Sequence, residues 1–266
     1  MAVENGNGEN KTQILEQLYV PYSVATNMPF VTCDEETFMD QVWMYTYPEG
    51  VQEFAKKYED KKIPFKGAII KREHSAEFFL ELHSMGVNEI VLCNGKTENK
   101  LELEKMGVFP DYSKLPEGQR PIFNPELQLS TIYFFQEVRR EGVDPEAEKE
   151  KLEELAEEMY ASIANSRFLM PVLMEEEEGK KKMRFPFLTH KNGQKFQPIF
   201  SDAVQYDKYV KKQKPDEATR VIMIDLEGLK KYLLSHVEGY MLNVEGYCHV
   251  LTKQQLEYIS QRFKAD

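Results

Sequence analysis

Short apolar runs separated by turn residues dominate the hydrophobic pattern of the chain. Runs with period-two alternation predict strands, which we expect at residues 18–24, 30–33, 42–47, 65–70, 89–93, 121–124, 167–174, 182–190, 195–200, 219–224 and 240–244. Apolar residues three and four apart predict amphipathic helices, which we expect at residues 12–18, 48–58, 75–84, 130–141, 145–164, 202–212, 226–237 and 252–263. Strand pairs and helices mixed in this way indicate an α+β fold.

Two parts of the chain share an ordered set of similar segments. Each part has an apolar segment with a central proline, a Pro-Phe segment ending in Thr, an aromatic strand leading into an amphipathic stretch, and a closing segment with Asn. The matched pairs are residues 18–22 and 168–172, 28–32 and 185–189, 43–46 and 198–201, and 122–126 and 241–245. A repeated order of elements predicts a duplicated fold unit. We therefore expect two tandem units, each a mixed or antiparallel sheet with helices packed on it.

The predicted boundaries follow from the duplication and from one strong helix start. Asp144-Pro145-Glu146 combines a capping residue, a proline suited to the first turn and an acid at the positive helix end. We expect a flexible tail at 1–11, a first unit at 12–141, and a second unit at 144–266 that opens with a linker helix at 145–164. The Glu- and Lys-rich face of that helix fits a solvated surface, with a basic partner as the alternative.

An acidic run is followed closely by a basic run at residues 175–182. Four Glu residues are followed by Gly179 and three Lys residues. On opposite arms of a β-hairpin these charges would form cross-strand pairs. We therefore predict an exposed hairpin tip rather than a cation site.

Composition and charge narrow the class of partner. The formal net charge is -11, which disfavours nucleic acid and anionic membrane surfaces because both require clustered Lys and Arg. No apolar run is long enough to span a bilayer. The cysteines Cys33, Cys93 and Cys248 have neither disulfide-framework nor zinc-site spacing. These features predict a cytoplasmic protein with no nucleic-acid or membrane partner.

The common catalytic motifs are absent from the sequence. There is no phosphate-binding or dinucleotide-binding glycine loop, no nucleophile elbow and no paired metal-binding histidines. Cys248 and His249 are adjacent, so in a strand their side chains would point to opposite faces. We therefore predict no catalytic, cofactor-binding or metal-binding residue. A hydrolase or a small-ligand-binding protein with carboxylates scattered along the chain is the alternative, because such groups meet only in space.

Aromatic side chains mark the candidate interaction surface. Trp43, Tyr45 and Tyr47 would share one strand face, and Phe196 and Phe200 lie in the matched segment of the second unit. One interpretation is core packing, because aromatic residues bury large areas. The other is a recognition surface for a protein partner, if the face is open. The sequence leaves the partner and the oligomeric state undetermined.

The matched segments resemble the SseB family, named after enhanced serine sensitivity. The resemblance rests on the Val-Pro or Met-Pro strand, the Pro-Phe-Leu-Thr segment, the aromatic strand at 198–202 and the closing Asn element before a final helix. It is best over 166–263 and weaker over 18–141. Asn124-Pro125 keeps the closing Asn-Pro motif, whereas Asn243 is followed by Val244. The resemblance implies an α+β domain, often in tandem, in bacterial cytosolic proteins with no established enzymatic activity. We therefore expect a cytosolic, non-enzymatic protein-interaction or regulatory module.

Overall fold

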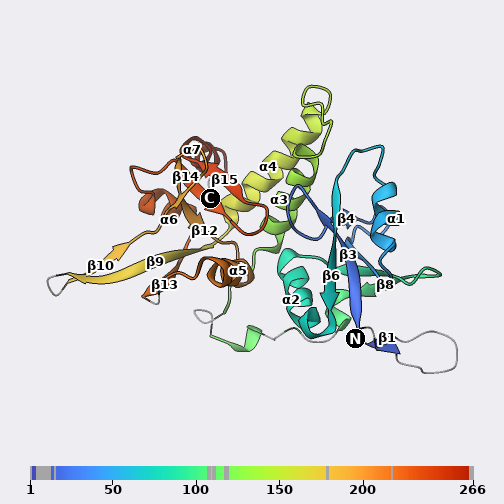
Figure 1. Ribbon diagram of the computed structural model, residues 1–266. Coiled ribbons are helices and arrows are strands. Elements are labelled where there is room, and N and C mark those ends of the chain that lie inside the picture. The colour runs from blue at the N-terminus through green and yellow to red at the C-terminus, as the bar shows by residue number, and fades with distance from the viewer. Residues whose placement is uncertain are drawn as a thin grey trace. The chain divides into compact units, whose positions relative to one another are not determined.

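The chain folds as two compact α+β units, which confirms the predicted fold class (Figure 1). The computed structural model describes residues 16–106, 109, 112–116, 120–177, 180–216 and 218–263, together with the short strands β1 (Ala2–Val3) and β2 (Gln13–Ile14). The first unit comprises residues 1–110 and 135–144, and the second comprises 111–134 and 145–266. Apart from β1, the predicted tail at 1–11 lies outside the described residues.

A mixed sheet with strand order β6-β3-β5-β7-β8 forms the first unit. Its strands are β3 (Gln17–Ser23), β4 (Val31–Cys33), β5 (Asp40–Tyr45), β6 (Phe65–Lys71), β7 (Glu89–Cys93) and β8 (Glu98–Glu102). β5 and β7 are parallel, and the other neighbours, including β4 against β5, are antiparallel. The helical segments are α1 (Gly50–Lys56), η1 (Arg72–His74), α2 (Ser75–Met85) and η2 (Leu103–Met106).

The face of this sheet that carries the odd-numbered residues of β5 and β7 packs on α1. Phe54 of α1 contacts Trp43, Tyr45 and Phe65 with ring centroids 5.9, 6.5 and 5.3 Å away. Together with Phe30 these rings form an aromatic cluster. Edge-to-face pairs of this kind add about 0.5–1.5 kcal/mol each beyond the area they bury. The same face therefore holds both the predicted aromatic surface and a buried aromatic cluster.

Two sheets form the second unit, with orders β10-β9-β13 and β11-β12-β14-β15. Their strands are β9 (Phe168–Glu177), β10 (Lys180–Arg184), β11 (Leu188–Thr189), β12 (Lys195–Ile199), β13 (Thr219–Ile224), β14 (Gly239–Leu242) and β15 (His249–Thr252). An isolated bridge between Leu169 and Phe200 links the two sheets. The helical segments are η3 (Tyr112–Lys114), α4 (Lys149–Asn165), α5 (Ala203–Gln213), α6 (Leu226–Tyr232) and α7 (Lys253–Arg262). Helix α3 (Pro125–Val138) has its residues 125–134 in this unit.

The two units have corresponding strand orders. The order β6-β3-β5-β7-β8 of the first corresponds to β13-β9-β12-β14-β15 of the second, once the Leu169–Phe200 bridge is counted as the β9–β12 link. β12 and β14 are parallel, as β5 and β7 are. The single β3–β5 pair, Tyr19 with Tyr45, falls at the same place in the matched segments as Leu169 with Phe200.

One matched pair does not occupy corresponding positions. Met241 and Leu242 lie in β14 and pair with β12, whereas residues 121–124 form no strand and precede α3. In the first unit the position of β14 is taken by β7. The predicted strand at 121–124 is therefore wrong. Its proline-rich surroundings lack the donors that a ladder needs.

Several other elements differ from their predicted bounds. Residues 13–14 and 17–18 are in strands, so the helix expected at 12–18 is wrong. β8 and β15 were not predicted. The sequence of β8, Glu-Asn-Lys-Leu-Glu, lacks an apolar face. Residues 111–134, expected in the first unit, belong with the second.

Two local predictions are confirmed. In the register of the β9–β10 hairpin, Glu175 lies opposite Lys182 and Glu176 lies opposite Lys181. The tip residues 178–179 lie outside the described residues. At the start of α7, Thr252 and Gln255 form the predicted capping box.

Candidate binding site

The predicted aromatic residues share a face in the first unit, but α1 covers much of it. Tyr45 is only 3% exposed, while Trp43 and Tyr47 are partly exposed. In the second unit Phe196 and Phe200 are buried, at 3% and 0% exposure. Tyr45, Phe196 and Phe200 therefore pack in cores, which is the first of the two interpretations that the sequence left open. Trp43 and Tyr47 remain accessible.

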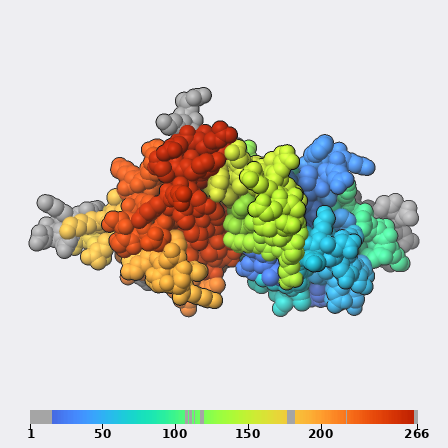
Figure 2. Space-filling view, turned by 90° about the horizontal axis from the view of Figure 1, so that it is seen from above, coloured from blue at the N-terminus to red at the C-terminus, as the bar shows by residue number. Residues whose placement is uncertain are grey.

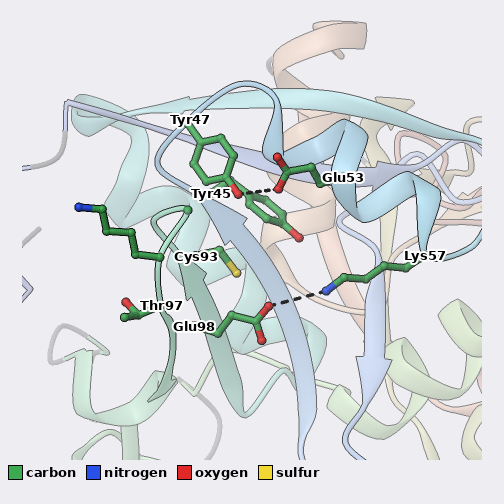
Figure 3. A pocket seen from close by; sticks show the side chains of 9 residues that line it. Tyr45, Tyr47, Glu53, Lys57, Cys93, Thr97 and Glu98 are labelled. Carbon is green, nitrogen blue, oxygen red and sulfur yellow. Dashed lines mark hydrogen bonds and ion pairs between the residues drawn. The ribbon is translucent and has the colours of Figure 1, made fainter.

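A pocket of about 320 Å³ opens beside Tyr47, at the carboxyl ends of β5 and β7 (Figure 3). Tyr45 and Cys93, at the ends of the two parallel strands, form its floor. Glu53 and Lys57 come from α1 and the residue that follows it. The turn between β7 and β8 completes the wall with Gly95, Lys96, Thr97 and Glu98. Carboxyl ends of neighbouring parallel strands are a common place for ligand sites.

The charged side chains around this pocket are paired with one another or with rings. The Tyr47 hydroxyl donates a 2.7 Å hydrogen bond to Glu53, which raises the pKa of Tyr47 to about 12. The Lys57 ammonium lies 3.8 Å from Glu98 and 4.1 Å from the centroid of the Trp43 ring. Because these contacts are solvent-exposed, each is weak and open to exchange for a ligand's groups. The pocket therefore offers two carboxylates and a lysine that can exchange partners.

The groups on the pocket floor are protonated at neutral pH. Burial raises the pKa of the Cys93 thiol to about 11, and the nearby Glu98 carboxylate adds to the shift. Burial likewise raises the pKa of Tyr45. A thiol is a nucleophile only as the thiolate. This arrangement suits binding through rings, hydrogen bonds and ion pairs rather than nucleophilic catalysis.

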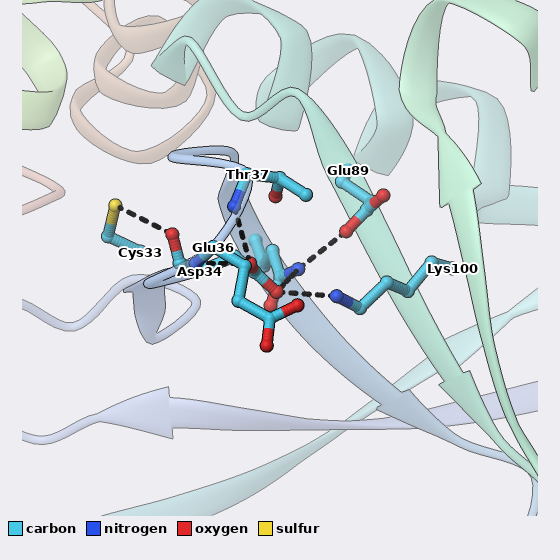
Figure 4. A network of polar contacts seen from close by, with 7 residues as sticks. Cys33, Asp34, Glu36, Thr37, Glu89 and Lys100 are labelled. Atoms are coloured by element: carbon cyan, nitrogen blue, oxygen red, sulfur yellow. Dashed lines mark hydrogen bonds and ion pairs between the residues drawn. The ribbon is translucent and has the colours of Figure 1, made fainter.

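A second polar cluster in the first unit holds the β4–β5 loop (Figure 4). One oxygen of Asp34 accepts from the backbone N–H groups of Glu36 and Thr37 at 3.0 and 2.9 Å. The other accepts from Lys100 and from Gln41, which also donates to the buried Glu89. The hydrogen bond from Lys100 is the largest cause that holds the pKa of Asp34 well below its usual range, and the backbone N–H donors add to it. All the acceptors are satisfied within the fold, so this cluster positions a loop.

In the second unit, side chains from the start of α3 bind the residues that follow β12 and β14. Ser201 and Asp202 follow β12 as Thr46 and Tyr47 follow β5, and Asn243 follows β14. The Asn124 amide donates to the Ser201 carbonyl oxygen, and the Asn243 side-chain oxygen accepts from the Ser201 N–H at 3.0 Å. The two asparagines singled out in the sequence thus bind the two backbone groups of one residue, Ser201. Pro125 begins α3 directly after Asn124.

Asp202 lies at the centre of this buried network. Its carboxylate accepts from Gln128 and from the Ser201 hydroxyl at 2.7 Å each, and from the Gln205 N–H at 3.0 Å, which caps α5. Burial nevertheless raises its pKa above the ordinary value. The Asn243 amide donates to the Tyr247 hydroxyl at 2.7 Å. The network ties the start of α3 to the ends of β12 and β14.

The sequence did not single out Glu53, Lys57, Gln128 or Tyr247. Asp202 could have been found, because an Asp directly before an amphipathic stretch is a helix-cap signal. Gln128 and Tyr247 carry no such signal, since they meet Asp202 only through the fold. Within the described ranges, no group of three His, Cys, Asp or Glu residues is placed to hold a metal ion. Nor is any helix among those residues long and apolar enough to cross a membrane.

These features define an α+β protein with an open pocket in one unit and a buried polar network in the other. Residues 146–250, within the second unit, match the family model described as the SseB protein N-terminal domain. No curated protein matches the chain by sequence.

Among solved structures, Tic22 from Plasmodium falciparum is 14% identical, with 93% of this chain and 94% of that chain covered and a TM-score of 0.22. Anabaena Tic22 (protein transport) is 8% identical, with 94% of each chain covered and a TM-score of 0.21. At such TM-scores these likenesses carry no argument about this chain.

Proposed function

We propose that the chain is a cytosolic, non-enzymatic protein-interaction module built from two duplicated SseB-like units. In this proposal a segment of a partner protein docks into the pocket beside Tyr47. The cytosolic setting is supported by the three free thiols, which suit a reducing compartment. The absence of a thiolate or a metal cluster from the pocket's described lining fits a binding role.

Duplication is supported by side chains as well as strand order. Phe54 of α1 packs on Tyr45 with ring centroids 6.5 Å apart. Tyr209 of α5 packs on Phe200 with centroids 5.0 Å apart. The helix residue stands nine positions after its strand partner in both units, because 54 minus 45 and 209 minus 200 are both 9. Such equivalence is expected of two copies of one fold unit.

The observation that carries the proposed function is the contrast between the two corresponding sites. In the second unit the carboxyl ends of the central parallel strands are covered by polypeptide, through Asn124 and Gln128. In the first unit an open pocket lies beside the corresponding strand ends. A place that binds polypeptide in one copy of a fold unit is suited to bind polypeptide in the other.

The lining of the open pocket indicates the kind of segment it would take. An aromatic or aliphatic side chain would pack on Tyr45 and Tyr47. Charged neighbours would pair with Lys57 or Lys96 on one side and with Glu53 or Glu98 on the other. Aromatic residues are frequent anchors at such surfaces, and truncating a true anchor costs about 2 kcal/mol or more.

A small molecule is the second candidate ligand. A volume of about 320 Å³ lies at the lower end of the range for small-molecule sites, roughly 300–1,000 Å³. Native mass spectrometry of the purified chain distinguishes the two, since a retained small molecule would appear as a discrete added mass that Tyr47→Ala removes.

Site-specific photo-crosslinking tests the protein-partner proposal. A Lys96→p-benzoylphenylalanine variant places the reactive group on the pocket wall, and the same change at the exposed Lys191 is the matched control. We expect a discrete polypeptide adduct from position 96 but not from position 191. Addition of Tyr47→Ala should abolish the adduct. No adduct, or one that persists with Tyr47→Ala, would overturn the proposal.

A further inference from the structure

A groove between α4 and α7 of the second unit is separate from both sites described above. It encloses about 650 Å³ and is lined by Glu150, Glu153, Glu154, Ala156, Glu157, Tyr160 and Tyr258. Figure 2 shows the surfaces of α4 (yellow-green) and α7 (red) side by side. The linker helix predicted at 145–164 thus presents its acidic face here, while its apolar residues Met159 and Ile163 are buried.

Two tyrosines give the groove an aromatic floor. Tyr160 of α4 and Tyr258 of α7 meet edge to face with ring centroids 5.8 Å apart. Gln255 donates a 3.1 Å hydrogen bond to the Tyr160 hydroxyl and fixes that ring. Tyr258 remains 44% exposed. A fixed ring beside an exposed ring is a suitable surface for an apolar side chain or for a cation over an aromatic face.

The charges around these rings are unbalanced. Glu153 pairs with Lys149 at 3.7 Å, and Glu157 pairs with Arg262 at 3.5 Å. Neither Glu150 nor Glu154 forms an ion pair with any residue that the structure describes. They are four positions apart on one helix face, where two like charges repel and destabilise the helix. A cationic ligand would relieve this repulsion.

We propose that the α4–α7 groove docks a basic amphipathic helix of a partner protein. Its Arg or Lys residues would pair with Glu150 and Glu154, and an apolar residue would pack on Tyr160 and Tyr258. This inference adds a second surface to the proposed interaction module but does not depend on the Tyr47 pocket, so either surface can fail alone. Charge complementarity selects the ligand, because an acidic or neutral segment would leave the glutamates unpaired.

The test uses the full chain and a fluorescein-labelled amphipathic peptide of Leu, Ala and Arg, about 18 residues long. A peptide with Glu in place of every Arg is the comparison ligand. By fluorescence anisotropy, we expect the Arg peptide to bind and the Glu peptide not to bind. Tyr258→Ala and the double variant Glu150→Gln with Glu154→Gln should each weaken binding at least about fivefold. Tyr47→Ala should leave it unchanged.

A matched control separates specific docking from general attraction to an acidic protein. The double variant Glu35→Gln with Glu36→Gln removes two exposed charges from the first unit, so its net charge equals that of the groove variant. We expect it to bind the Arg peptide like the unmodified chain. The groove variant should also melt about 1 °C higher than the unmodified chain, because it loses a like-charge pair. Equal weakening by both double variants, or no weakening by Tyr258→Ala, would overturn the proposal.

Discussion

The side-chain amide of Gln128 donates a 2.7 Å hydrogen bond to the buried carboxylate of Asp202. This contact joins the first turns of α3 to the start of α5, and Ser201 and Asn243 complete the network around it. In the second unit the chain itself therefore binds the residues at the carboxyl ends of the two parallel strands, whereas a pocket lies beside the corresponding strand ends of the first unit.

Asp202 should make the free energy of unfolding depend on pH. Burial raises its folded-state pKa above the ordinary 3.8, despite four hydrogen bonds that oppose the shift. Its contribution to stability is therefore fully present below pH 3.8 and is lost as the pH rises through the folded-state pKa. We expect Asp202→Asn to remove this decline from the free energy of unfolding, measured by urea titration across the acidic to neutral range. An unchanged pH profile would contradict the assignment.

Asn124 and Asn243 should be energetically coupled, because both bind backbone groups of Ser201. Asn243→Ala leaves the buried Ser201 N–H without its acceptor and removes one hydrogen bond of the Tyr247 hydroxyl, so we expect a loss of about 1–3 kcal/mol. A double-mutant cycle with Asn124→Ala, measured by chemical denaturation, should show an interaction energy of at least about 0.5 kcal/mol. Strict additivity would mean that the two asparagines act independently.

Gly50 and Gly67 should differ sharply in their tolerance of alanine. A Cβ on Gly50 would lie 2.1 Å from a Tyr45 ring carbon, whereas one on Gly67 would lie 3.7 Å from Val51. We expect Gly50→Ala to cost about 1–3 kcal/mol through overpacking, although alanine favours helices. Gly67→Ala should stay within about 0.5 kcal/mol of the unmodified chain. Similar denaturation midpoints for the two variants would contradict the packing described for Tyr45.

Cys93 should be unreactive in the folded protein. Its pKa is raised to about 11 and its side chain is buried, whereas Cys33 is exposed. With Ellman's reagent near pH 8, a Cys33→Ser variant should lose the fast-reacting thiol, and Cys93 should react only after denaturation. Rapid modification of Cys93 in the native chain, located by peptide mapping, would show that the pocket floor is more open than the structure indicates.

The shared aromatic face was predictable from the sequence because strand side chains alternate. Period two places Trp43, Tyr45 and Tyr47 on one face, and in the structure all three belong to or pack against the same aromatic cluster, although β5 ends at Tyr45. What covers that face was not predictable. Phe54 reaches it from a helix whose own short sequence does not reveal its partner strand. The pocket likewise required the fold, because Glu53 and Lys57 come from α1 and its C-terminal cap, whereas Glu98 comes from β8.

The asparagine motif shows a different limit. Asn124 and Asn243 were matched as equivalent ends of two repeats, yet both act at Ser201 within the second unit. The short segments around them look alike, but Asn243 follows a strand and Asn124 precedes a helix. Sequence similarity over about five residues cannot separate these roles, because the hydrogen-bond partners lie far away along the chain.

Fluorescence of Trp43 gives the most direct test of the central claim that a partner segment docks beside Tyr47. Trp43 is the only tryptophan in the chain, and Lys57, which lines the pocket, lies over its ring. The segment recovered by crosslinking from position 96 would be synthesised and titrated into the full chain. We predict a saturable change in Trp43 emission, with affinity at least about thirtyfold weaker in Tyr47→Ala, the equivalent of about 2 kcal/mol. Equal affinity in both proteins, or binding without any change at Trp43, would contradict the claim.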